Sequence, residues 1–101
     1  MEHQDRVAEF IEVRDLDAPP AYRLLDLVSE VGELSKDAVE STAYGHEPGD
    51  IDVATDEVGD VLFSLFALAE ALDIDAGEAL DVALSKYDGR IREDGAPSSG
   101  E

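Results

Sequence analysis

Residues 56–69 read DEVGDVLFSLFALA, and they decide the fold because apolar side chains occupy nearly the whole circumference of a helix built from them. A helix of this kind is buried on most of its sides, so the stretch predicts a central helix with neighbours packed around it. Asp52 and Thr55 stand just before it, where their side chains can cap exposed backbone N–H groups. We therefore expect the helix to begin between these two residues.

Three further segments show the apolar spacing of amphipathic helices. The first covers residues 2–13. The second begins near Pro20, a residue suited to a first helical turn, and ends before Tyr44. The third covers residues 76–92. No segment convincingly alternates apolar and polar residues as a half-buried strand does, so the predicted fold class is all-α.

These helices predict one small domain, a four-helix bundle-like arrangement over residues 1–92, followed by a disordered tail over residues 93–101. A helix that is apolar on nearly every side needs more neighbours than three short amphipathic helices supply. We therefore expect a homodimer or homotetramer, in which further copies of the chain complete the core.

The charge of the chain narrows the range of partners. Its 26 acidic residues against 7 basic ones give a net charge of −19, which opposes binding to nucleic acid and to anionic lipid. Only Lys36 and Lys86 are lysines, and this combination of acid excess with few lysines resembles proteins of salt-accumulating halophiles. We expect a halophilic protein that loses cooperative folding at low ionic strength, because its self-repulsion is then unscreened.

The sequence also limits location and chemistry. The longest apolar run, residues 61–69, is interrupted by Ser64 and is far shorter than the ~20 residues that span a bilayer. The amino-terminal MEHQDR does not resemble a secretory signal, so we expect a cytoplasmic protein without a membrane segment. The chain has no cysteine, and catalysis must therefore rely on oxygen or nitrogen groups.

Two pairs of carboxylates are suited to metal chemistry. Glu30 and Glu33 lie three residues apart in one predicted helix, and Glu57 and Asp60 have the same spacing in the next. Each pair therefore lies on one side of its helix. Mg²⁺ prefers oxygen ligands and usually takes a few carboxylates together with water and substrate phosphates. Two facing acid pairs would supply such a set.

The acids can also be explained as solvent-exposed surface charges. This explanation suits the first helix better than the second. The first carries a stripe of acids that a solvated helix face would also show. The members of this stripe are Glu30, Glu33, Asp37 and Glu40. Glu57 and Asp60 instead share the small-residue side of an otherwise apolar helix, where an acid needs a partner. The second pair is therefore the stronger metal candidate.

Gly32 and Gly59 stand inside the two acid pairs. Glycine in a helix interior costs roughly 0.5–1 kcal/mol relative to alanine, so two of them need a structural reason. Close approach of the two helices at these positions would supply that reason, and it would also bring the acid pairs together.

Lys86 and Arg90 lie four residues apart on one side of the last predicted helix, in a chain with 7 basic residues. Such a pair can clamp the phosphates of a nucleotide. Two simpler interpretations remain open: the pair complements the negative end of the helix dipole, or it forms ion pairs with acids of the same chain.

The residues around these acids resemble the MazG-like nucleotide pyrophosphohydrolase family, whose hallmark is Glu-Glu-x-x-Glu on one helix and Glu-x-x-Asp on the next. Here the hallmark reads SEVGE at residues 29–33 and EVGD at residues 57–60. Ser29 therefore replaces the first motif glutamate, and Leu16 stands where the family often has an aromatic residue. The surrounding stretches follow the family's order: LVSEVGEL (27–34), DEVGDVLFSLFALA (56–69), LDIDAGEA (72–79) and KYDGR (86–90).

The resemblance implies a four-helix, oligomeric enzyme that depends on Mg²⁺, with Mn²⁺ as a substitute ion. Its metal ligands would be Glu30, Glu33, Glu57 and Asp60. The resemblance also implies that Lys86 and Arg90 contact phosphates. The expected reaction converts a nucleoside or deoxynucleoside triphosphate to its monophosphate and pyrophosphate, as house-cleaning of the nucleotide pool. Glu33 is our candidate for the base that takes a proton from the attacking water.

Two alternatives stay open. The chain is either a relative with a narrow substrate, such as a phosphoribosyl-ATP pyrophosphatase, or a catalytically silent acidic interaction module in which Ser29 marks lost activity. A di-iron carboxylate bundle is disfavoured, because neither His3 nor His46 follows a glutamate by three residues.

Overall fold

The structure is a computed structural model that describes residues 2–95. Within this range it contains no strand, which confirms the all-α prediction. Its elements are α1 (Glu2–Val13), α2 (Pro20–Ser41), a short 3-10 helix η1 (Pro48–Asp50), α3 (Thr55–Ala71) and α4 (Ala76–Asp94). The last helix continues two residues beyond the predicted Arg92, and residues 96–101 of the predicted tail lie outside the described residues.

The helix ends follow from local chemistry at most boundaries. Pro20 opens α2, where its missing N–H leaves no bond unmade. Asp75 caps α4 by accepting a hydrogen bond of 2.9 Å from the backbone N–H of Glu78 to its Oδ1. Gly95 follows α4 with a φ of 76°, the left-handed conformation that commonly ends a helix.

The predicted side-chain cap of α3 is wrong. The capping position is Ala54, whose methyl group accepts no hydrogen bond, and Thr55 already belongs to the helix. The backbone N–H of Asp52 donates instead to the hydroxyl of Ser41 at 2.9 Å. This bond ties the loop before α3 to the last turn of α2.

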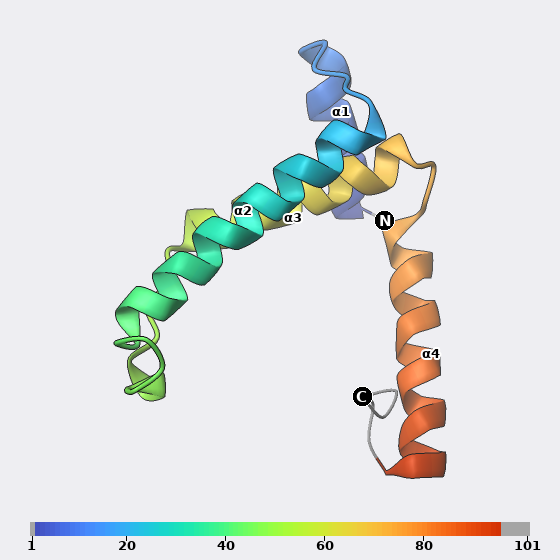
Figure 1. Ribbon diagram of the computed structural model, residues 1–101. Coiled ribbons are helices and arrows are strands. Elements are labelled where there is room, and N and C mark those ends of the chain that lie inside the picture. Colours follow the sequence, from blue (N-terminus) through green and yellow to red (C-terminus); the bar gives the residue numbers. More distant parts are fainter. Residues whose placement is uncertain (1, 96–101) are drawn as a thin grey trace.

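Helix α3 lies at the centre of the packing. Helix α2 runs beside it in the opposite direction, and α1 packs across α3 near the amino-terminal end of α2 (Figure 1). The small side chains of Ser64, Ala67 and Ala69 are buried on α3, which allows its neighbours to lie close. Phe66 of α3 and Ile11 of α1 complete the buried set of apolar and small residues in this region.

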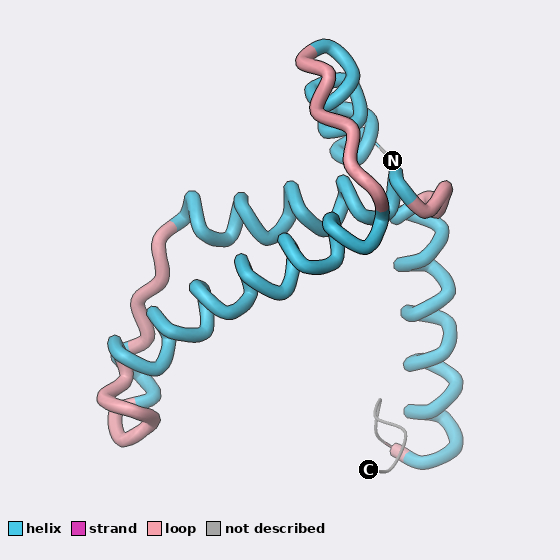
Figure 2. The backbone as a smooth tube through the Cα atoms, turned by 45° about the horizontal axis from the view of Figure 1, so that its top comes forward, coloured by secondary structure: helices cyan, strands magenta, loops and turns pink. Residues whose placement is uncertain are grey.

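Helix α4 leaves this group of helices. It packs along none of the other described helices and projects away from them (Figures 1 and 2). The Cα radius of gyration is 16.5 Å, whereas a compact domain of this length has about 13 Å. A single chain is therefore an open arrangement rather than a closed four-helix bundle.

The prediction that α3 is buried on most sides holds only for the two sides that meet α1 and α2. A third side remains exposed, with Val58 at 40%, Leu65 at 43% and Leu72 at 48% exposure. Apolar side chains of α4, among them Leu80, are exposed as well. The physical reason is that α4 projects away from the other helices and does not cover this side. No described helix is both long and apolar enough to cross a membrane.

Candidate metal and phosphate site

The antiparallel packing of α2 and α3 brings the two acid pairs to one interface. Burial raises the pKa of Glu30, and the negative charges of Glu33 and Asp60 raise it further. Glu33 belongs to the same helix as Glu30, whereas Asp60 comes from α3. These three carboxylates therefore share one electrostatic neighbourhood, which a bound cation would stabilise.

Glu57 of α3 lies in the same interface. Its Oε2 atom is shielded from solvent and has no hydrogen-bond partner in the structure. The pKa of Glu57 is raised to about 7, first by hydrogen bonding of its carboxyl group with Asp37 and then by burial and the negative charge of Asp37. A shielded carboxylate oxygen without a partner is costly for the fold, so it is a natural position for a cation ligand.

Asp37 was not predicted as a site residue. The sequence placed it on a stripe of α2 acids that resembled a solvated face. The structure instead turns part of that stripe toward α3, because Glu30 and Asp37 are half-buried whereas Glu33 and Glu40 are exposed. Its position seven residues after Glu30, two helical turns along the same side, was the available signal.

The described acids do not form a complete set of metal ligands by themselves. Among residues 2–95, no three acidic or histidine side chains converge closely enough to hold a metal ion on their own. All the donors at the interface are carboxylate oxygens, the ligand type that Mg²⁺ prefers, and Mg²⁺ commonly completes its shell with water and phosphate. The donor chemistry and the unpartnered Oε2 atom of Glu57 therefore fit a divalent cation of this kind.

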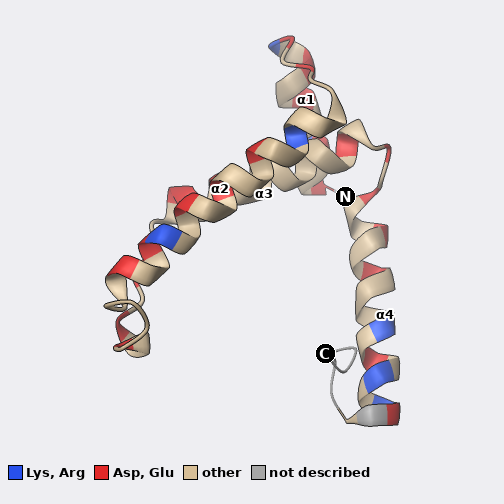
Figure 3. Ribbon diagram, viewed as in Figure 1, with Lys and Arg blue, Asp and Glu red and all other residues tan. Residues whose placement is uncertain are grey.

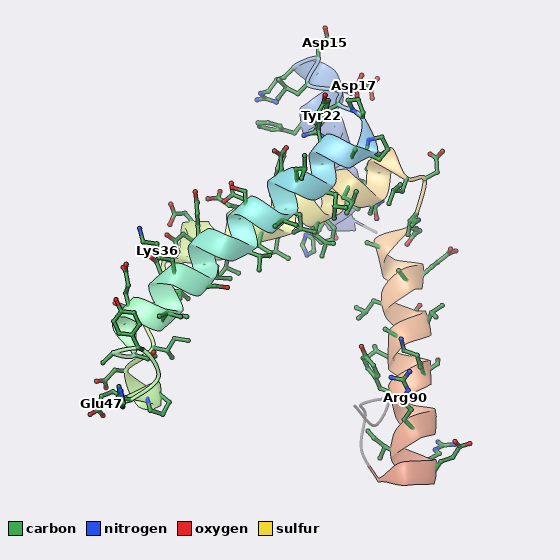
Figure 4. The ribbon with its side chains drawn as sticks, in the orientation of Figure 1. Asp15, Asp17, Tyr22, Lys36, Glu47 and Arg90 are labelled. Atoms are coloured by element: carbon green, nitrogen blue, oxygen red, sulfur yellow. The ribbon has the colours of Figure 1, made fainter. Side chains whose placement is uncertain are left out.

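The predicted phosphate clamp lies on α4. Lys86 and Arg90 flank the ring of Tyr87, with the Lys86 Nζ atom 5.3 Å and the Arg90 Cζ atom 6.0 Å from its centroid. Figure 3 shows acidic residues along α2 and α3 and the basic residues of α4 on its far half. In Figure 4, Arg90 of α4 lies far from Lys36, which belongs to the acid-bearing helix α2. One chain does not bring its basic pair to its own acids.

The interpretation of the two glycines is wrong within a single chain. A Cβ atom added at Gly32 or at Gly59 would meet no other atom within 4 Å. The helices therefore meet without needing glycine at these positions.

Replacing Gly32 or Gly59 with alanine is therefore expected to raise the free energy of unfolding of the metal-free protein by roughly 0.5–1 kcal/mol each. The added methyl group meets open space, while the unfolded chain loses backbone freedom. Urea unfolding of both variants beside the wild type measures the change. A loss of stability in either variant would mean that another molecule lies over that glycine in solution.

The raised pKa of Glu57 predicts a pH dependence. The folded metal-free chain keeps a proton on Glu57 between its ordinary pKa of 4.5 and about 7, where the unfolded chain has lost it. The free energy of unfolding should therefore fall as the pH rises from about 4.5 to about 7. Mg²⁺ needs the ionised carboxylate, so its affinity should fall as the pH drops below about 7.

Thermal unfolding with a chelator, together with calorimetric Mg²⁺ titration, tests both statements over this pH range. The Glu57→Gln variant is the control, because its metal-free stability should lose the contribution of Glu57 to the pH dependence. An equal dependence in the variant and the wild type would show that Glu57 does not hold the proton.

The part of the chain that carries these acidic and basic residues is similar to known proteins. The MazG nucleotide pyrophosphohydrolase domain family matches residues 20–93, a range that includes both acid pairs and the basic pair. An uncharacterized protein of Bacillus subtilis (strain 168), YpjD, is 35% identical over 78 residues, which cover 73% of this chain and 68% of that protein. No solved structure matches. The chain therefore belongs to the MazG nucleotide pyrophosphohydrolase domain family.

Proposed function

We propose that the protein is a Mg²⁺-dependent nucleoside triphosphate pyrophosphohydrolase, which converts a nucleoside or deoxynucleoside triphosphate and water to the monophosphate and pyrophosphate. The observation that carries the proposal is the meeting of two helical acid pairs at the α2–α3 interface, where the Oε2 atom of Glu57 is shielded and unpartnered. Members of this family act on nucleoside triphosphates and generally depend on a divalent metal, which supports the reaction type.

Four carboxylates would hold the cation: Glu30, Glu33, Glu57 and Asp60. A bound Mg²⁺ supplies charge neutralisation on the phosphates and lowers the pKa of a water molecule, and Mn²⁺ can replace it. Glu33 is exposed at the edge of the interface, so the carboxylate oxygen that does not bind the cation would receive the proton of an attacking water. The water oxygen bonds to the α-phosphorus, and the bond from that phosphorus to the α–β bridging oxygen breaks.

Lys86 and Arg90 would hold the pyrophosphate that leaves. Their positive charges match the charge that develops on the leaving oxygen. They carry this role only if they reach the acids, which α4 does not permit within one chain. We therefore infer a homodimer, or a homotetramer built from such dimers, in which α4 of one copy lies against the α2–α3 interface of the other.

This assembly would also cover apolar surface. The exposed side of α3 and the apolar residues of α4, such as Leu80 and Leu84, are both available in a single chain. Contiguous exposed apolar surface of this kind commonly marks a contact with another protein molecule. One contact would thus complete both the core and the site.

The physiological role that fits these parts is removal of unwanted nucleotides from the cytoplasmic pool. Two features favour the alternative of a catalytically silent interaction module: Ser29 replaces a motif glutamate, and the described acids form no complete set of metal ligands by themselves. A narrow-substrate enzyme, such as a phosphoribosyl-ATP pyrophosphatase, is the other alternative.

Pyrophosphate release from a panel of canonical, damaged and phosphoribosylated nucleotides tests the proposal, at high salt with Mg²⁺, with Mn²⁺ and with a chelator. Turnover that needs the metal supports it, and the substrate profile separates the house-cleaning role from the narrow-substrate one. Calorimetric titration of the nucleotide-free protein with Mg²⁺ accompanies the assay. Absence of both turnover and saturable Mg²⁺ binding would establish the silent module instead.

A further inference from the structure

Gln4, in the first turn of α1, is a buried polar residue that the reaction does not use. Its side chain is 4% exposed. Its Nε2 atom donates hydrogen bonds to the Glu70 Oε1 atom at 2.9 Å and to the Ile74 carbonyl oxygen at 2.7 Å. Its Oε1 atom accepts a hydrogen bond of 2.6 Å from the backbone N–H of Ala76. One amide group thus joins three points that lie close together in the sequence.

These three points surround the elbow between α3 and α4. Glu70 lies in the last turn of α3, Ile74 lies in the connection, and Ala76 is the first residue of α4. The connection reverses at Asp73, which has a φ of 54°, and the backbone N–H of Ile74 donates to the Ala69 carbonyl oxygen at 2.9 Å. Gln4, which belongs to α1, therefore links the end of α3, the connection and the start of α4.

The bonding pattern suits an amide and no other common side chain of this size. Two partners, the Glu70 carboxylate and the Ile74 carbonyl, are acceptors, whereas the N–H of Ala76 is a donor. A glutamate would keep the bond to Ala76 but would supply no donors and would repel Glu70. An apolar side chain would leave all three groups unsatisfied in a buried place, which is costly.

The direction of α4 depends on this elbow because α4 packs along no other described helix. Arg90 stands 14 residues beyond Ala76, or about 21 Å along the helix axis. A rotation of about 10° at the elbow therefore moves Arg90 by nearly 4 Å, and misplacement of about 1 Å can already lower a rate strongly.

We propose that Gln4 is a positioning residue, which fixes the angle at which α4 leaves α3 and so determines where Lys86 and Arg90 reach a second copy of the chain. The claim that Gln4 fixes the angle of α4 rests on these hydrogen bonds alone. The delivery of the basic pair to phosphates rests on the proposed function. The two parts have separate readouts.

Spin-label distances measure the angle directly, because the chain has no cysteine of its own. Labels at Ala21→Cys on α2 and Ser85→Cys on α4 occupy exposed positions, and dilution with unlabelled protein isolates the distances within one chain. The wild type should give one narrow distance distribution. Gln4→Leu, which keeps the packing volume but removes the three bonds, should broaden or shift it. An unchanged distribution overturns the proposal.

A charge exchange provides the second test. Gln4→Glu should disturb the distance because two carboxylates then face each other. Adding Glu70→Gln restores a donor and an acceptor across this contact, so the double variant should recover much of the wild-type distribution. Failure of the double variant to recover more than Gln4→Glu alone would show that the contact between residues 4 and 70 does not set the angle.

Kinetics test the delivery of the basic pair. Gln4→Leu should lower kcat/KM for pyrophosphate release by about tenfold, mainly through kcat, while the Mg²⁺ affinity of the nucleotide-free protein stays at the wild-type value. Thr42→Val is the matched control, since Thr42 is also buried and its hydroxyl group donates to the Ala38 carbonyl and accepts from the Gly45 N–H, at the end of α2 far from α4. It should lower the melting temperature without changing the spin-label distance.

The outcomes separate the two proposals. A wild type without pyrophosphate release would overturn the proposed function, and the distance distributions would still decide whether Gln4 sets the angle of α4. An altered distance distribution with unchanged kcat/KM would overturn the delivery of the basic pair while the enzyme assignment stands.

Discussion

Replacing Glu57 with glutamine is expected to lower kcat/KM for pyrophosphate release by at least about 100-fold, since even the outer partners of metal ligands are worth about 10–100-fold. Glutamine keeps the size of the side chain but removes the negative charge that Mg²⁺ requires. Pyrophosphate release and calorimetric Mg²⁺ titration measure the two effects together. Asp60→Asn should act in the same direction, because Asp60 shares the electrostatic neighbourhood of Glu30.

A matched variant separates the site from the general charge of the protein. Glu40→Gln removes one negative charge from the exposed part of the same α2 stripe, so its turnover and Mg²⁺ affinity should stay at the wild-type values. The metal-free Glu57→Gln protein should also melt at a higher temperature than the wild type above pH 7, since its buried group no longer has to ionise. If Glu40→Gln lost as much turnover and Mg²⁺ affinity as Glu57→Gln, Glu57 would not belong to the metal site.

Mixing two inactive variants is expected to restore activity. One variant carries Glu57→Gln, and the other carries Lys86→Gln with Arg90→Gln. If α4 serves the site of its partner, a mixed dimer contains one site with intact acids and an intact basic pair. In an isologous dimer, random exchange of equal amounts should then recover about a quarter of the wild-type turnover.

The separate variants provide the baseline for this mixture. Each should release pyrophosphate at a rate far below the wild type, and size-exclusion chromatography with light scattering should show the same assembly for both. A mixture that exchanges subunits but stays as inactive as its components would place Lys86 and Arg90 at the site of their own chain.

Much of the fold was predictable from the sequence because residues that favour turns and helix ends mark where its helices begin and end. Pro20 opens α2, the turn at Asp73 and Asp75 separates α3 from α4, and the periodicity between such points gave α1 its full observed range. The cap of α3 was not predictable in the same way. Ala54 rather than Thr55 takes the capping position, and a shift of one residue is enough to remove the side-chain bond.

The sequence indicates the candidate site residues but not how their helices are oriented. The motif spacing indicated Glu57 and Asp60, and the structure places Glu57 in the α2–α3 interface. Asp37 was missed because an acidic stripe has the same spacing whether it faces water or a neighbouring helix. Only tertiary packing decides which side of α2 meets α3. Likewise, the apolar side of α4 indicates burial without specifying which chain provides the covering surface.

The open shape of the single chain has a consequence for how the protein is stabilised. Ile11, Phe66, Ala67 and Ala69 are its buried apolar residues within the described range, a small core for a free-standing domain. In the proposed dimer, folding and association would draw on the same apolar surface, and mass action would link them. Cellular abundance would thus set the fraction of working sites: a dilute population would hold few of them, and synthesis of more chains would raise activity more steeply than in proportion to their number.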